Sequence, residues 1–196
     1  MSDVDRAMEE ALAALEAAPD GWLGLPERRR LREAMGPWTP AYEPGGPDAG
    51  LLRRAELHAA AARRALPVWE AAFPGDRRPH DLVASVLATL RSGWPPEGMS
   101  AEAAPLESDL EQLAVEPGRA AAFNAGMAAV HLSAEAADGD LDPDLYPPDT
   151  EDEDLDEPLV ETLAAWALAE DDPDGTREFW RWYVSEAFPA AYAVSE

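Results

Sequence analysis

An alanine-rich stretch with a single proline, residues 57–79 (LHAAAARRALPVWEAAFPGDRRP), restricts the folds open to this chain. Apolar or near-apolar side chains recur in steps of three and four from just before this stretch to its middle: Ala55, His58, Ala62, Leu66, Trp69 and Phe73. That spacing predicts one buried stripe along an α-helix. Pro67 lacks an amide proton and its ring clashes with the preceding turn, so we expect the helix to kink or restart there. Pro74 and Gly75 end it, and residues 76–79 form a charged corner before the next helix.

The rest of the chain carries further helical patterns and no convincing strand. Helices are expected over residues 4–18, 26–35, 48–73, 80–91, 100–115, 117–134, 158–168 and 176–188. The expected N-caps are Asp48 and Ser100. Prolines should open three helices and end the last one: Pro26, Pro117, Pro158 and Pro189. We predict an all-α fold, an irregular bundle of roughly seven or eight helices with an acidic, proline-containing surface loop.

The length and composition predict one domain. The 196 residues can bury a substantial core; we expect an N-terminal helix or arm over residues 1–20 and a single all-α domain over residues 21–196. The chain has no cysteine, which excludes disulfides and thiolate metal sites. The start MSDVDRAMEE is unlike a secretory signal, and no apolar run approaches the roughly 20 residues that span a bilayer. These features predict a cytoplasmic protein.

Charge is distributed unevenly along the chain. Residues 1–92 hold 12 Arg against 14 Asp and Glu, whereas residues 93–196 hold 3 Arg against 26. The formal net charge is −25, almost all of it in the second part. Such a field repels nucleic acid and anionic lipid and attracts a basic partner, so we expect neither direct nucleic-acid binding nor membrane binding.

Residues 138–157 are the most acidic part, with 11 carboxylates in 20 positions and several prolines. Like-charge repulsion and proline both oppose regular structure, so an extended surface loop is expected. It serves either solubility alone or docking on a basic groove of a partner, with Leu145 and Tyr146 as apolar anchors. The candidate partner-binding residues are Asp138, Asp140, Asp142, Asp144, Leu145, Tyr146, Asp149, Glu151, Asp152, Glu153, Asp154, Asp156 and Glu157.

No pattern of residues predicts catalysis, a cofactor or a metal. The three histidines, His58, His80 and His131, are widely spaced and form no HxxxH or HExxH arrangement. Residues 138–144 alternate carboxylates like the start of an EF-hand loop, but Pro143 stands at the turn position. The chain has no GxSxG, P-loop or GxGxxG motif. Carboxylate pairs are too abundant to indicate a hydrolytic site, and we therefore expect a protein that is not an enzyme.

Several local patterns favour a structural interpretation over a functional one. The Arg28–Arg30 run could be a basic patch, but a solvated face that pairs with local carboxylates is favoured. Small side chains between residues 125 and 129 should let a neighbouring helix approach closely. Dense aromatic residues near the C-terminus are typical of core packing. The charged corner is interpreted as a capping and salt-bridge network rather than a binding cluster.

Several segments, in order, resemble a known family. The string LPVWEAAFPGDRRP over residues 66–79 is the most specific, joined by PERRR at 26–30, DLYPPDT at 144–150 and FWRWY at 179–183. Together they resemble the fifth family of immunity proteins from bacterial polymorphic toxin systems, over about residues 26–192. The residues expected to be structural are Trp69, Glu70, Phe73, Asp76, Arg77, Arg78, Pro79, Trp180 and Trp182.

The resemblance implies an all-α protein, encoded beside a toxin, that binds and neutralises that toxin without catalysis. Combined with the charge, it predicts an antitoxin that covers a basic active-site surface, and the toxin is expected to be a basic protein such as a nuclease. The alternative is an acidic helical interaction or regulatory module for another basic protein. Neither interpretation requires a cofactor.

Overall fold

The computed structural model describes residues 2–36, 48–92, 99–114, 116–138, 159–169 and 172–195. Within these ranges every regular element is helical and none is a strand, which confirms the all-α prediction. The helices are α1 (Asp3–Ala17), α2 (Leu25–Ala34), α3 (Ala49–Ala72), α4 (Arg78–Arg91), α5 (Met99–Leu113), α6 (Ala120–Asp138), α7 (Val160–Ala169), α8 (Pro173–Trp182) and α9 (Phe188–Tyr192). A π-helical turn, Tyr183–Ala187, joins α8 to α9, and a 3₁₀ turn, Ala193–Ser195, follows.

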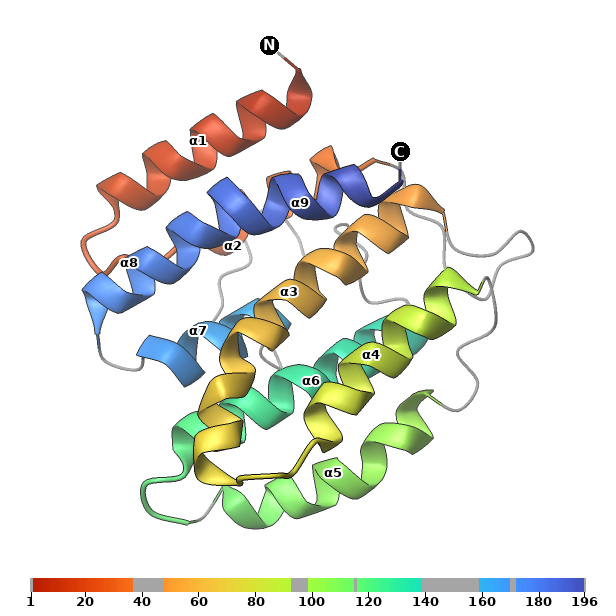
Figure 1. The fold of residues 1–196 in the computed structure, drawn as a ribbon. Coiled ribbons are helices and arrows are strands. Elements are labelled where there is room, and N and C mark those ends of the chain that lie inside the picture. Colours follow the sequence, from red (N-terminus) through yellow and green to blue (C-terminus); the bar gives the residue numbers. More distant parts are fainter. Residues whose placement is uncertain are drawn as a thin grey trace.

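Helix α3 lies at the centre of the fold (Figure 1). It packs against α4, α6 and α7 on one side and against α9 on another. The α8–α9 segment lies between α3 and α1, and α1 also packs on α2. Helix α6 contacts α3, α4, α5 and α7, so the core lies chiefly between α3 and α6.

The long helix α3 begins and continues largely as its residues predict. The Asp48 carboxylate accepts a hydrogen bond from the Leu51 amide at 2.8 Å and so caps the helix. The predicted stripe is buried, with Phe73 at its partly buried end. Pro67 lies inside one continuous helix. Figure 1 shows the last turns of α3 running at an angle to its first turns, so the chain bends rather than restarts.

Close helix packing depends on the small residues of α6, as predicted. A Cβ atom placed on Gly126 would lie 2.7 Å from Leu110 Cδ2 and 3.1 Å from Trp69 Cζ3. Both distances are shorter than normal carbon contacts, so a larger residue at this position would force the Leu110 and Trp69 side chains to shift.

Three predicted helix ends are wrong. Pro117 does not open α6, because Gly118 takes a φ of 75° that a helix does not allow, and α6 begins at Ala120. Ser100 is the second residue of α5 rather than its N-cap. Pro189 does not end the last helix. The amide of Phe188 bonds back to the Tyr183 carbonyl, and this wider π-turn lets the chain stay helical through a residue with no amide proton.

Candidate functional site

A cluster of charged side chains lies in the interior, where α2, α3, α6 and α7 meet. Glu161 of α7 is fully buried and pairs with two arginines of α2. Its Oε1 accepts hydrogen bonds from Arg32 Nη2 and from Arg28 Nη1, the latter at 3.3 Å. Arg28 Nη1 also donates to the Thr162 hydroxyl at 2.9 Å. These buried ion pairs and hydrogen bonds connect α2 to α7 within the core.

His58 of α3 extends this cluster to α6. Its Nδ1 lies 2.6 Å from Glu135 Oε2, and its Nε2 lies 3.4 Å from Glu161 Oε2. The other oxygen of Glu135 accepts the Val160 amide at 3.4 Å, at the first residue of α7. Arg54, also buried, donates to the main-chain carbonyls of Arg32 and Gly36 at the end of α2. We call Arg28, Arg32, His58, Glu135 and Glu161 the buried ion cluster.

The buried ion cluster is electrostatically coupled. Burial alone would raise the pKa of the Glu161 carboxyl, but Arg32, His58 and Arg28 hold that pKa well below its usual value. Burial alone would lower the pKa of Arg32, but the nearby negative charge of Glu161 outweighs this effect, and the pKa of Arg32 is raised. Burial, followed by the charge of Glu161, raises the pKa of Tyr183. All five cluster members are buried, so they hold helices together rather than face a ligand.

The structure contradicts the predicted solvated face of the Arg28–Arg30 run at Arg28 and confirms it at Arg29 and Arg30. Arg29 and Arg30 do pair locally, with Glu33 and Glu27, on the surface. Arg28 and Arg32 instead point into the core, one helical turn apart. The signal was present in the sequence: they share their face with Leu25 and Leu31, and Glu161 is the one charged residue in the apolar run VETLAAWALA.

The charged corner between α3 and α4 contains a second polar network. Arg78 bonds to Asp76 at 2.7 Å and to Asp109 of α5 at 2.6 Å. The Trp69 indole donates to the Asp76 carbonyl at 3.2 Å, and His80 lies 2.7 Å from Glu70. Phe73 stacks tilted on Trp69, 4.5 Å between ring centroids. The corner therefore joins α3, α4 and α5 through its own side chains.

The other residues that were expected to be structural range from fully buried to exposed. Pro79 is buried in the first turn of α4, while Arg77 lies beside Asp81 at the surface. Trp180 is fully buried, and Arg28 lies 5.2 Å from its ring centroid. Trp182 is partly buried beneath Arg64, which lies 4.2 Å from the ring centroid.

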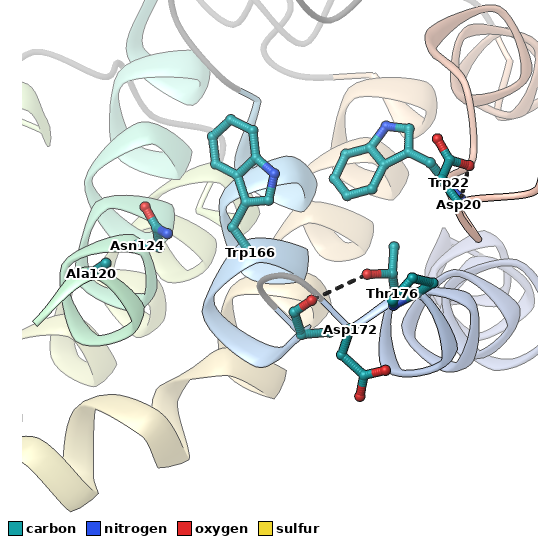
Figure 2. Close-up of a pocket in the computed structure, with 9 residues that line it drawn as sticks. Asp20, Trp22, Ala120, Asn124, Trp166, Asp172 and Thr176 are labelled. Atoms are coloured by element: carbon teal, nitrogen blue, oxygen red, sulfur yellow. Dashed lines mark hydrogen bonds between the residues drawn. The ribbon is translucent and has the colours of Figure 1, made fainter. Parts of the chain in front are cut away.

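A surface cleft of about 720 Å³ opens between α6, α7, α8 and the segment before α2 (Figure 2). Trp22 and Trp166 line it, with ring centroids 6.5 Å apart and planes 27° apart. Asp20 and Asp172 stand at the cleft, and Asn124 of α6 lines it from the side of Trp166 away from Trp22. We call this space the tryptophan cleft. Although Trp166 belongs to a mostly apolar helix, it is 39% exposed.

The acidic candidate segment lies outside the part of the chain whose side chains are described. This applies to Asp138, Asp140, Asp142, Asp144, Leu145, Tyr146, Asp149, Glu151, Asp152, Glu153, Asp154, Asp156 and Glu157. The described chain resumes at Leu159, and α7, with Glu161 and Trp166, follows directly. Among the described residues, no group of three histidine, aspartate or glutamate side chains converges as metal ligands would. No described helix is long and apolar enough to cross a bilayer.

The chain matches the model of a known protein family. The family described as Immunity protein Imm5 matches residues 8–190, which is nearly the whole chain. The match takes in α2 to α8 and both polar networks. No curated protein matches the chain.

Proposed function

The chain belongs to the Imm5 family of immunity proteins, which neutralise a cognate toxin and are not enzymes. We propose that this chain neutralises its toxin by covering a basic active-site surface of that toxin. In this proposal the toxin is a basic protein such as a nuclease, whose groove normally accepts phosphates. A nuclease acts on nucleic acid in the cell, so the complex would form in the cytoplasm.

The charge asymmetry carries the proposal. Residues 93–196 hold 26 carboxylates and 3 arginines, and 11 of those carboxylates lie in residues 138–157. Many arginines of the first part are already engaged: Arg28, Arg32 and Arg54 are buried, and Arg78 and Arg91 pair with carboxylates. A strongly negative surface attracts a basic partner at long range and competes with the phosphates of a nucleic acid.

Co-expression tests the family function. The toxin domain encoded beside this gene should arrest growth alone, and this chain should restore growth and co-purify with it. If growth stays arrested in the presence of this chain and no complex is recovered, that domain is not the cognate toxin of this chain.

Salt dependence tests the charge mechanism separately. The Debye length falls from about 10 Å at 0.1 M salt to about 3 Å at 1 M. The association rate of the purified pair, measured by stopped-flow fluorescence, should therefore drop by at least about tenfold across this range. An association rate that stays constant would show that the toxin is held by apolar contacts, and occlusion by the acidic part would be rejected.

A further inference from the structure

The tryptophan cleft has a partly exposed aromatic wall. Along α7 every residue is buried except Trp166 and Leu168, both 39% exposed. They are two of the three large apolar side chains exposed among the described residues. Only Trp166 of the pair lines the cleft, where its indole stacks beside Trp22. Trp22 is in turn braced edge-on by the buried Trp180, 5.3 Å between centroids.

The tryptophan cleft is also negatively charged and rigidly built. The Asp20 carboxylate accepts a hydrogen bond from the Trp22 amide at 3.0 Å, and the Asp172 carboxylate accepts one from the Asp174 amide at 3.1 Å. These main-chain hydrogen bonds hold both carboxylates in position. None of the described residues that line the cleft is basic. The arginines nearest in sequence are engaged elsewhere: Arg177 bonds to the Ala18 carbonyl, and Arg119 lies 5.1 Å from the centroid of Phe73.

Asn124 adds a polar side chain to the tryptophan cleft. Its side chain is only 8% exposed, it lines the tryptophan cleft, and it makes no hydrogen bond with the described residues. Neither amide atom of Asn124 is a fully buried atom without a partner, so the amide is open to the cleft. A bound group can therefore form a hydrogen bond with it there. Its carbonyl oxygen can accept a hydrogen bond beside the Trp166 ring.

We propose that the tryptophan cleft receives an arginine side chain of the toxin. A guanidinium is planar, stacks on an indole face, and carries five donors that suit several acceptors at once. In the cleft it would lie against the Trp166 ring on the side of Asn124, whose carbonyl oxygen would accept a hydrogen bond, while Asp20 and Asp172 add negative charge to the cleft as a whole. This inference rests on the proposed function. It adds a specific contact site for the toxin to the long-range electrostatic attraction between the two proteins.

Two matched substitutions on α7 test the aromatic contact. Trp166→Ala should weaken binding of the co-purified toxin domain by at least about tenfold, as for an aromatic hot spot, while Leu168→Ala should change it less than about twofold. The two side chains are equally exposed, and circular dichroism and thermal unfolding check that both variants fold. If both variants bind toxin like the wild type, the tryptophan cleft is not a docking site, although the proposed function stands. A wild-type chain that binds no toxin would instead reject the function itself.

A third variant tests the charge. Asp20→Asn with Asp172→Asn keeps both acceptors of main-chain amides but removes both negative charges. We expect toxin affinity to fall about tenfold or more, mainly through faster dissociation. Unchanged affinity in this double variant, beside a defect in Trp166→Ala, would show that an apolar group occupies the cleft, and the arginine assignment would be wrong.

Discussion

Glu161 is a carboxylate in the interior whose charge the fold depends on. Replacing it with glutamine would keep its size but leave Arg28 and Arg32 buried without a counter-charge. Breaking a buried pair in this way costs about 3–5 kcal/mol of unfolding free energy. We expect Glu161→Gln to lose that much in urea titrations followed by tryptophan fluorescence. Glu33→Gln, which removes the surface partner of Arg29, is the control and should lose less than about 1 kcal/mol.

The pH dependence of the same residue follows from its lowered pKa. A carboxyl whose folded pKa lies below its unfolded value of 4.5 stabilises the fold above that pH and loses its contribution as pH falls. The difference in unfolding free energy between wild type and Glu161→Gln should therefore be full at pH 7 and shrink below about pH 4.5. Urea titrations of both proteins at several pH values measure it. A difference that stays constant down to pH 3 would contradict the electrostatic account.

At this residue scale the sequence allowed only part of the cluster to be predicted. His58 was correctly placed on the buried stripe of α3 because helical spacing determines which face a residue occupies. Its partners Glu135 and Glu161 are 77 and 103 positions away, and spacing along one helix carries no information on such pairing. Trp166 shows the converse limit. Helix α7 is apolar on all sides, so its sequence could not show which side stays exposed.

At the scale of helices, the contact of α6 with α3 and α5 depends on Gly126. Alanine in an open helix position is about 1 kcal/mol more stable than glycine. Here its Cβ would overlap Leu110 and Trp69, so we expect Gly126→Ala to lower the unfolding free energy by about 1–3 kcal/mol. Chemical denaturation measures this loss.

A double-mutant cycle is the control for that prediction. Leu110→Ala makes room for the added methyl, so the combined variant should be more stable than the sum of the single effects indicates. Strict additivity would show that Gly126 acts through its backbone rather than through close packing.

The ends of helices could be predicted where a capping residue or the spacing of apolar residues indicates them. They could not be predicted where the backbone conformation determines where a helix begins or ends. Asp48 caps α3 through a local hydrogen bond that sequence alone indicates. Pro189 was predicted to end a helix, yet the π-turn before it accommodates the missing amide. That turn is stabilised by buried Tyr183, Val184 and Phe188, and such tertiary packing overrides a local preference.

For the whole molecule, the proposed mechanism separates charges that guide the toxin from contacts that hold it. If residues 138–157 mainly attract the toxin, neutralising part of them should slow association and leave dissociation nearly unchanged. The test variant changes four carboxylates to amides: Glu151, Asp152, Glu153 and Asp154. The control variant makes the same change in charge on the exposed faces of α1 and α5: Glu9, Glu10, Glu107 and Glu111.

Comparing the two variants separates local docking from net charge, because each lowers the net negative charge equally. Stopped-flow mixing with the toxin domain at low salt should show an association rate several-fold slower for the first variant than for the second, since a field decays within about 10 Å at 0.1 M salt. Equal slowing would show that only the overall charge matters. A faster dissociation of the first variant would instead place these carboxylates in direct contact with the toxin, where their loss leaves basic groups unpaired.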